Sequence, residues 1–372
     1  MKFWRFVSFA FAVPFLFFLN SCETGSGVAT FQRMSTSWDI ALMSDFQAAA
    51  AVYDDMDIIC HSARSAEEQA SQIKKAVRHG ADAIVVNAMD SEHVLPVVEN
   101  AYDSGVYVIL LGNTIPTKKF HAFAGTNNME LGTMAGHLVE NALPDGGNVV
   151  ELTVDTDQPF FHERKDGFHD VIDANDKVNI IASVVGDWSQ EKAHAAIDSL
   201  KMSLGETPVD LIYSYGDDML LGALKSGMYP NAKFVGTDGI PGESLQHIAS
   251  GDISFSILTQ TGAHDAISAA YNLINGFSCD RFVFCRPVLV DSTNVFAVSS
   301  SISDTHFLAK KSMDLRSSLH KAKARLSRYI DILYLALFLL TLSCLTLVLN
   351  ISSHRRREKM AFAPDSLAGR FV

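Results

Sequence analysis

The segment from Gly80 to Asn113 restricts the fold of this chain more than any other stretch of its sequence. It contains two continuously apolar runs, at residues 83–86 and 106–111, with a polar turn after the first. Between them lies a segment whose apolar residues recur at helical spacing: Val94, Val97, Val98 and Ala101. Continuous apolar runs are typical of parallel strands that helices cover on both faces. The segment therefore predicts a βαβ unit in a central parallel sheet.

The same alternation of strand and helix patterns extends along the chain. Further strand-like runs, with helical patterns between them, occur at residues 149–154, 180–185, 210–213, 233–235 and 253–258. A chain of alternating strands and helices that is longer than ~250 residues usually divides into two lobes. We therefore predict an α/β fold with two doubly wound parallel-sheet lobes.

Five consecutive blocks of this region resemble the bacterial periplasmic sugar-binding proteins of the ribose and galactose type. These relatives also include the effector domain of lactose-repressor-like regulators. The blocks follow the order of that family and lie at residues 80–113, 162–172, 215–226, 234–253 and 261–277. The resemblance covers about residues 28–293. It implies the type I periplasmic binding fold, in which two lobes joined by three crossovers enclose a small polar ligand.

The resemblance also implies where the chain passes from one lobe to the other. The crossovers would lie near Asn127, Thr259 and Cys285. The two lobes would then hold these approximate ranges: residues 28–126 with 260–284, and residues 127–259 with 285–293.

The first 22 residues have the pattern of an export signal. Lys2 and Arg5 precede an apolar stretch, residues 6–19, of the length found in signal peptides. The sequence Leu-Asn-Ser-Cys that ends at Cys22 resembles the lipobox of bacterial lipoproteins, in which Cys22 would be lipidated. Asn20 is not the usual residue at its position. The alternative is an uncleaved membrane anchor.

Residues 331–351 predict a transmembrane helix. Its centre, Ile332 to Leu349, is an apolar run of 18 residues, and a basic cluster follows at residues 354–357. Eighteen residues at ~1.5 Å each cover the hydrocarbon core of a bilayer. Basic residues also precede the run, so the orientation depends on the export signal, which places residues 23–330 outside and residues 352–372 in a cytoplasmic tail. A buried core helix is the alternative.

Residues 305–330 predict a helical stalk before the membrane. Apolar residues recur there at the heptad spacing of a coiled coil. They are Leu308, Leu315, Leu319, Ala322, Leu326, Tyr329 and Leu333. This seam predicts a parallel homodimer, and the alternative is a single amphipathic helix that lies on its own lobe.

Composition excludes some classes of function. The formal net charge is −12 and no basic stripe is present, which argues against nucleic-acid binding. The sequence has no Gly-x-Ser-x-Gly elbow or phosphate-binding loop, and its histidines lack the spacing of zinc enzymes. We therefore expect no catalytic residues, no cofactor and no metal site.

The resemblance assigns three residues to a ligand site between the lobes. Arg164 matches the arginine of an Arg-x-x-Gly-Phe motif, Asp238 matches a ligand-binding aspartate, and Trp38 falls where a first-loop aromatic residue lines the cleft. A sugar has hydroxyl groups and apolar C–H faces, which suit charged hydrogen-bonding groups and an aromatic ring. The alternatives are a surface arginine, a turn aspartate and a core tryptophan.

Asn113, Asp217 and Gln260 are weaker assignments from the same resemblance. The family commonly has an Asp-Arg pair after the second strand of the opening βαβ unit, where this chain has Gly112 and Asn113. An asparagine that the family often has before the next aspartate is replaced by Gly216, although Asp217 remains. These departures leave open which sugar binds, and whether sugar binding is retained.

The C-terminal half most resembles the periplasmic sensor regions of hybrid two-component histidine kinases, at residues 261–267 and 287–295. Such sensors continue into a kinase, whereas this chain ends at Val372, so we expect a truncated sensor or a receptor that signals through a separate histidine kinase. The expected function is a non-enzymatic receptor in the cell membrane that senses a small sugar ligand in the periplasm. The alternative is the substrate-binding lipoprotein of an ABC sugar importer.

Overall fold

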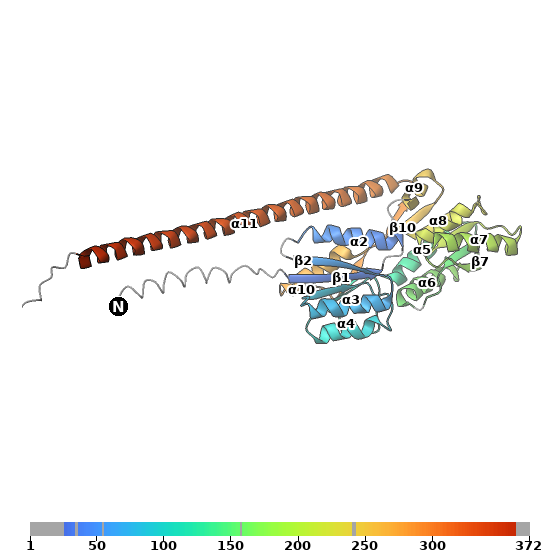
Figure 1. Cartoon of the computed structure of the whole chain (residues 1–372). Helices are drawn as coiled ribbons and strands as arrows, with labels where there is room; N and C mark the ends of the chain where they lie inside the picture. The colour runs from blue at the N-terminus through green and yellow to red at the C-terminus, as the bar shows by residue number, and fades with distance from the viewer. Residues whose placement is uncertain (1–25, 34–35, 54–55, 157, 240–242, 362–372) are drawn as a thin grey trace, which may run out of the picture. The chain divides into compact units, whose positions relative to one another are not determined.

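The computed structural model describes residues 26–33, 36–53, 56–156, 158–239 and 243–361. The predicted signal peptide, with Cys22, and the end of the predicted cytoplasmic tail lie outside the described residues. The chain divides into two units, residues 1–310 and 311–372. Both α/β lobes belong to the first unit (Figure 1).

The first lobe is built on a six-stranded parallel sheet in the order β11-β5-β4-β3-β1-β2. Its strands are β1 (Ser26–Arg33), β2 (Met56–Ala63), β3 (Ala83–Val86), β4 (Tyr107–Leu111), β5 (Ala122–Thr126) and β11 (Phe282–Cys285). Its helices are α2 (Ser37–Ala50), α3 (Ala66–Arg78), α4 (Val94–Asp103) and α10 (Ala263–Ile274). Figure 1 shows α2 on one side of the sheet and α3 with α4 on the other.

Each face of this sheet has its own hydrophobic core, because side chains alternate between the two faces of a strand. Ile84 and Val86 of β3 pack with the apolar residues of α3 and α4. Ala83 and Val85 of the same strand pack with those of α2 and α10. The continuous apolar run in this segment is therefore explained by burial on both faces, and the predicted βαβ unit is confirmed as β3, α4 and β4.

The second lobe has a six-stranded sheet in the order β12-β10-β9-β8-β6-β7. Its strands are β6 (Gly147–Thr153), β7 (Val178–Val185), β8 (Leu211–Ser214), β9 (Lys233–Asp238), β10 (Phe255–Leu258) and β12 (Val288–Asp291). Its helices are α5 (Asn128–Ala142), α6 (Pro159–Ile172), α7 (Gln190–Leu204), α8 (Asp217–Ser226) and α9 (Glu243–Ser250). The prediction of two parallel-sheet α/β lobes is confirmed, with one exception.

The exception is β12, which pairs with β10 in the antiparallel direction. Strand β11 is parallel to the other strands of the first sheet, so the chain leaves it at the same end of the sheet at which they all end. Only Arg286 and Pro287 connect β11 to β12. The chain therefore enters the second sheet from the edge at which the parallel strands of that sheet end. A strand that enters from this edge must run against its neighbours.

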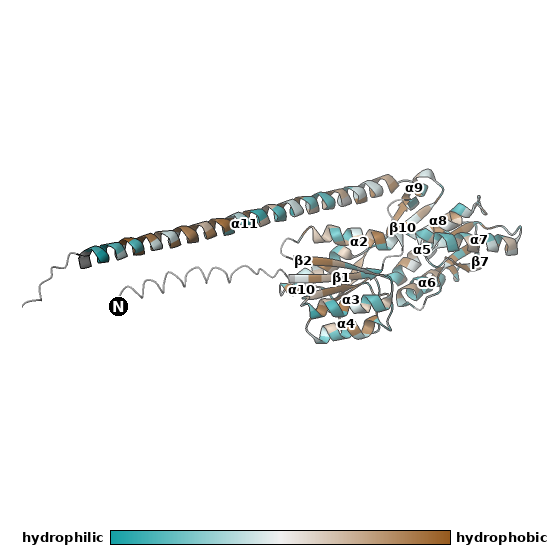
Figure 2. Ribbon diagram, in the orientation of Figure 1, coloured by the Kyte–Doolittle hydropathy of each residue, from teal (hydrophilic) through white to brown (hydrophobic). Residues whose placement is uncertain are grey.

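Helix α11 (Val295–Ala361) spans 67 residues. Its first turns belong to the second lobe, because Val295, Val298 and Ile302 pack against the core of that lobe. Within the described chain, α11 is the one helix that is long and apolar enough to cross a membrane, judged by length and composition. Figure 2 shows a mostly hydrophobic stretch in its C-terminal half, followed by polar residues. All seven residues of the predicted heptad seam are exposed.

Candidate ligand-binding cleft

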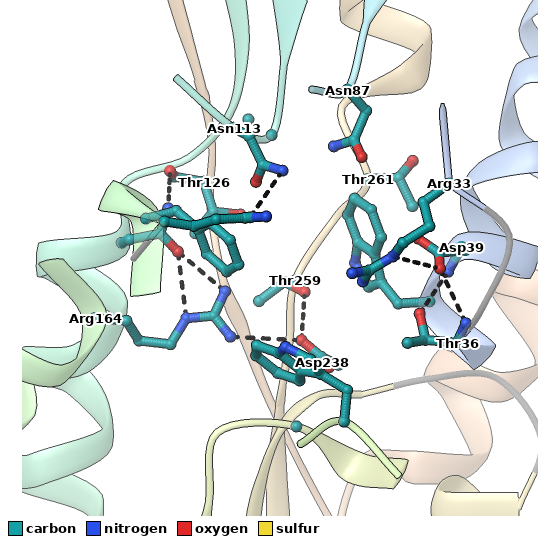
Figure 3. Close-up of a pocket in the computed structure, with 18 of the residues that line it drawn as sticks. Arg33, Thr36, Asp39, Asn87, Asn113, Thr126, Arg164, Asp238, Thr259 and Thr261 are labelled. Atoms are coloured by element: carbon teal, nitrogen blue, oxygen red, sulfur yellow. Dashed lines mark hydrogen bonds and ion pairs between the residues drawn. The ribbon is translucent and has the colours of Figure 1, made fainter. Parts of the chain in front are cut away.

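A cleft lies between the two lobes, at the edges where the strands of both sheets end (Figure 3). Loops that follow β1, β3 and β4 of the first lobe face loops that follow β7, β8 and β9 of the second. Ligands of open α/β sheets bind at this edge. Five of the six residues predicted for the ligand site line the cleft: Trp38, Asn113, Arg164, Asp238 and Gln260.

The sixth predicted residue, Asp217, does not line the cleft, and its assignment to the ligand site is corrected. Its side chain is buried beneath the sheet edge, where Oδ1 accepts a hydrogen bond of 2.8 Å from Ser256 Oγ. The next residue, Asp218, lines the cleft instead. Consecutive side chains on a helix point about 100° apart, so the motif located the start of α8 but not the side of the helix that faces the ligand.

Arg164 is fixed by hydrogen bonds on several sides, and only 6% of its surface is exposed. Its Nε and Nη2 donate to Oδ1 of Asn128 at 3.2 and 3.0 Å, and its Nη1 donates to the carbonyl oxygen of Tyr215 at 3.0 Å. Nη1 also lies 3.7 Å from Oδ1 of Asp238. The guanidinium group is thus held rigidly at the wall of the cleft, and the alternative of a surface arginine is wrong.

Two glycines explain how Arg164 comes so close to α5. A Cβ atom on Gly167 would lie 2.2 Å from the carbonyl oxygen of Met129, and one on Gly132 would lie 2.0 Å from that of Arg164. Helices α5 and α6 therefore pack backbone against backbone at this point. Phe168, the last residue of the Arg-x-x-Gly-Phe motif, is buried in the core of the lobe and anchors α6. In this motif the glycine allows α6 to pack closely on α5, the phenylalanine anchors α6 in the core, and together they place the arginine at the cleft.

Asp238 ends β9 with a φ of 106°, which is unusual for a residue other than glycine. Strained conformations of this kind cluster at ligand sites. Burial raises the pKa of its carboxyl group to about 8. The nearby Asp217 and Asp218 raise this pKa further, and the positive charge of Arg164 lowers it. Thr259 Oγ1 lies 3.5 Å from Oδ1. At neutral pH this carboxyl group can therefore both donate and accept hydrogen bonds.

Aromatic rings from both lobes form the apolar walls of the cleft. Trp38 comes from α2 of the first lobe, while Phe160 and Trp188 come from the second. The rings of Phe160 and Trp188 are stacked, with centroids 6.3 Å apart. A Cβ atom on Gly216 would lie 2.9 Å from the Trp188 ring, so the glycine at the position of the family's asparagine leaves room for this ring. The sequence analysis missed Trp188, although a tryptophan three residues after the strand-like run at residues 180–185 was an available signal.

Arg33 was also missed, and it supplies the first lobe with a cation. It ends β1, and its Nε donates to Oδ2 of Asp39 at 3.3 Å. The same carboxylate oxygen accepts a hydrogen bond from the backbone N of Thr36, the N-cap of α2. Arg33, Thr36 and Asp39 all line the cleft (Figure 3). This chain has Gly112 and Asn113 where the family commonly has an Asp-Arg pair, but Arg33 and Asp39 place an arginine–aspartate pair on the first lobe's wall from another strand.

Amide side chains connect the lobes on one side of the cleft. Gln158, which precedes α6 of the second lobe, donates from Nε2 to the carbonyl oxygen of Met89 in the first lobe at 2.7 Å. Its Oε1 lies 3.4 Å from Nδ2 of Asn113, which also donates to the carbonyl oxygen of Ala88. Gln158 gave no signal in the sequence, because its partner Met89 lies 69 residues away.

The cleft therefore presents hydrogen-bonding groups and aromatic faces to a small molecule. Within the described residues, no group of three or more His, Cys, Asp or Glu side chains could hold a metal ion. The arrangement suits the recognition of a polar molecule with apolar faces.

The sequence profile of the periplasmic binding protein domain family matches residues 28–277. The chain belongs to this family. A periplasmic binding protein domain works outside the cytoplasm. The chain is 25% identical over 169 residues to the ribose import binding protein of Bacillus subtilis. The aligned region covers 45% of this chain and 54% of that protein. It is 27% identical over 205 residues to the ribose import binding protein of Haemophilus influenzae. That aligned region covers 55% of this chain and 69% of the relative.

The chain thus spans about half the length of the first of these relatives. Among solved structures, the fructose-binding periplasmic domain of a hybrid two-component system matches with a TM-score of 0.72 and 23% identity, over 79% of this chain and 99% of that domain. An ABC transporter solute-binding protein from Actinobacillus succinogenes with bound D-allose matches with a TM-score of 0.68 and 21% identity, over 73% and 99% of the two chains. Both matches show the shared periplasmic binding fold, and the predicted resemblance to ribose-type proteins is confirmed.

Proposed function

We propose that this periplasmic binding protein domain binds a small neutral carbohydrate and that the whole chain is a membrane-anchored receptor that senses it. The observation that carries the proposal is a pair of arginine–aspartate contacts, one on each lobe, that line the same aromatic-walled cleft. Arg33 lies 3.3 Å from Asp39 in the first lobe, and Arg164 lies 3.7 Å from Asp238 in the second.

These contacts favour a neutral ligand. In the first lobe, an anionic ligand would have to compete with the Asp39 carboxylate that Arg33 already contacts. A sugar hydroxyl group can instead accept a hydrogen bond from the guanidinium group and donate one to the neighbouring carboxyl group at the same time. The faces of Trp38, Phe160 and Trp188 suit the apolar C–H surface of a sugar ring.

The names of the relatives agree with a small neutral polyol. Besides the two ribose import binding proteins, they include a xylitol-binding protein of Mycolicibacterium smegmatis, which is 24% identical to this chain over 245 residues. A site that only binds a sugar needs no catalytic groups, and we propose that the protein is not an enzyme.

The path of the chain after the cleft supports a sensor. Strands β11 and β12 carry it from the first lobe to the second, and Val295, Val298 and Ile302 then pack the start of α11 into the second lobe's core. Periplasmic binding proteins close around ligands by rigid-body motion about hinges. A motion of the second lobe must therefore carry the first turns of α11 with it.

We also propose the order of the remaining parts. Residues 1–22 would be a signal peptide with lipidation at Cys22, residues 305–330 a stalk that pairs two copies, and residues 331–351 the membrane span. Residues 352–372 would be a cytoplasmic tail. The exposed heptad residues and the apolar stretch of α11 support this arrangement. A histidine kinase would then receive the signal.

A second candidate function is the binding component of an ABC sugar importer. The curated relatives favour it, because several are named as import binding proteins. The apolar stretch of α11 favours the sensor, since an importer's binding protein gains nothing from a second anchor.

Ligand binding is tested with the full chain in detergent micelles. Thermal shift and isothermal titration calorimetry would compare D-ribose, D-fructose, D-galactose and myo-inositol with the charged D-galacturonate. We expect at least one neutral compound to raise the melting temperature and to bind with a measurable Kd. Stabilisation by galacturonate alone, or by none of the compounds, would overturn the proposal.

Anchoring is tested separately, by protease treatment of intact spheroplasts that express the chain with a tag after Val372. We expect residues 23–330 to be digested from the periplasmic side while the tag is protected. Loss of the tag would contradict the sensor, whereas release of an intact soluble domain would favour the importer component.

A further inference from the structure

The edge strand of the first sheet exposes two large aromatic side chains side by side. Phe282 and Phe284 of β11 are 50% and 53% exposed, and they lie on the same face because they are two residues apart in a strand. Their rings are nearly parallel, at 16°, with centroids 6.1 Å apart. Solvent-exposed apolar groups that lie together usually mark a binding surface.

The two rings rest on a firm base. Phe282 meets Phe120 edge-on at 5.8 Å, and Phe284 lies 6.0 Å from Phe123. Phe120 and Phe123 are buried in the core of the lobe. The guanidinium group of Arg281 lies 4.6 Å from the centroid of the Phe120 ring and covers it. The exposed rings therefore form a fixed platform, defined here as Phe282 and Phe284.

The platform lines a groove that adjoins the cleft. Four residues line both: Gly112, Thr126, Asn128 and Phe160. A molecule that binds in the cleft and extends past Thr126 would therefore meet the platform.

The groove also has polar groups that a sugar could use. Glu163 of α6 also lines it, together with Thr114 and Asn127. Within the described residues, the Glu163 carboxylate makes no hydrogen bond or ion pair, so it is available to accept hydrogen bonds from hydroxyl groups. A flat aromatic surface and a carboxylate in the same groove offer a sugar ring both apolar contact and a hydrogen-bond acceptor.

We propose that this groove is a second subsite, which holds the next sugar ring of a di- or oligosaccharide whose first ring occupies the cleft. The residues shared by the cleft and the groove, and the Glu163 carboxylate that no side chain among the described residues engages, favour this occupant over a protein partner. The inference rests on the proposed carbohydrate-binding function and narrows its ligand class.

The test compares monosaccharides with disaccharides of the same unit, by calorimetry on the full chain in detergent micelles. The pairs are D-fructose and inulobiose, D-galactose and galactobiose, D-xylose and xylobiose, and L-arabinose and arabinobiose. For the pair that binds, we expect the disaccharide to bind about tenfold more tightly than the monosaccharide. Phe284→Ala should remove this gain and leave the monosaccharide affinity unchanged, and Glu163→Gln should reduce the gain.

Phe277→Ala is the matched control, because Phe277 is 61% exposed but does not line the groove. It should change neither affinity. The unchanged monosaccharide affinity of Phe284→Ala shows that this variant is folded. A monosaccharide that binds at least as tightly as its disaccharide would overturn the second subsite alone, and so would a gain that survives Phe284→Ala.

Two further outcomes are informative. If no sugar of this panel binds, the second subsite is overturned; if D-ribose and myo-inositol also fail to bind, the proposed function fails with it. If Phe284→Ala changes the mass measured by light scattering but not the disaccharide affinity, the platform is an interface between copies of the chain, and the subsite is overturned.

Discussion

The carboxylate of Asp218 in the second lobe accepts two hydrogen bonds from Ser37 in the first lobe. Its Oδ2 lies 3.0 Å from the backbone N of Ser37, and its Oδ1 lies 2.8 Å from the hydroxyl oxygen. Ser37 is the first residue of α2, so the carboxylate also lies at the positive end of that helix's dipole. Together with the contact between Gln158 and Met89, this pair holds the lobes closed over the cleft.

Ser37→Ala should weaken ligand binding by shifting the equilibrium away from the closed form. The loss of one hydrogen bond to a carboxylate costs ~1.5–3 kcal/mol, which corresponds to at least about a tenfold weaker affinity. Because the contact exists only when the lobes are closed, the change should appear as faster dissociation in stopped-flow tryptophan fluorescence. Ser104→Ala is the control, since that hydroxyl donates within its own helix. An unchanged dissociation rate would show that the contact does not hold the closed form.

Arg164→Ala should weaken binding by ~1.5–3 kcal/mol, the range for a charge-assisted hydrogen bond. The variant also leaves the buried Oδ1 of Asn128 without its donor, so its melting temperature should fall even without ligand. Calorimetry measures the first effect and calorimetric melting the second. Lys165→Ala, on the next residue of α6, should change neither. An unchanged affinity would remove Arg164 from the binding site.

Asp238→Asn should alter how stability depends on pH. Burial raises the pKa of the folded-state carboxyl group to about 8, whereas an aspartate in an unfolded chain titrates near ~3.9. Between these values the unfolded state has already lost its proton, so the stability of the wild type falls as pH rises from about 4 to about 8.

The asparagine variant should lack this decline. Melting temperatures at pH 5, 7 and 9 measure it, with Asp280→Asn as the exposed control. Equal pH profiles for Asp238→Asn and the wild type would contradict the buried, protonated carboxyl group.

His169 and Glu151 should contribute stability in a different pH window. Nε2 of His169 lies 3.0 Å from Oε1 of Glu151, which is fully buried and also accepts hydrogen bonds from Tyr215 and Ser183. The hydrogen bond to Glu151 raises the pKa of His169. Burial alone would raise the pKa of Glu151, but the hydrogen bonds from His169, Ser183 and Tyr215 outweigh it and lower that pKa.

These two pKa shifts set the pH range in which the pair stabilises the fold. The raised histidine pKa gives stability that is present below ~6.5 and is lost as pH rises through the folded-state pKa. The lowered glutamate pKa gives stability that is present above ~4.3 and is lost at lower pH. His169→Gln should therefore reduce the free energy of unfolding by ~1–2 kcal/mol at pH 5.5 and by less at pH 8.5. Urea unfolding measures this, with the exposed His162→Gln as control, and an effect of equal size at both pH values would exclude the charged pair.

Leu319→Lys should break the proposed stalk dimer and leave sugar affinity unchanged. A lysine at a seam position buries a charge between paired helices, whereas Ser317→Lys, away from the seam, should be tolerated. Cysteine crosslinking along residues 315–330 in membranes measures the pairing. Crosslinks without a heptad repeat would refute the paired stalk, and a repeat that is insensitive to bound sugar would indicate a static anchor.

The elements that the sequence predicted well are those whose signal is local. The run at residues 83–86 became β3, and the helical spacing that begins at Val94 became α4, because burial on one or two faces sets the period of apolar residues along each element. The antiparallel direction of β12 carried no such signal. Its four residues have the pattern of a short strand, which does not indicate a direction. The direction is set by where the chain enters the second sheet, which is the cleft side.

The candidate site divides in the same way. Arg164 and Asp238 were found because each lies in a short motif whose neighbours position it, as Gly167 and Phe168 do for the arginine. Asp217 was placed on the wrong side of α8, because the motif does not state which of two adjacent carboxylates faces the cleft.

Contacts across the cleft could not be predicted from the chain alone. Ser37 and Asp218 are 181 residues apart, and neither has a neighbour in sequence that indicates the other. They meet because two sheets, each folded by its own apolar periodicity, bring the ends of their strands to a common edge. The periodicity of side chains is a property of each segment, whereas the pairing of polar groups between lobes depends on how the folded lobes close.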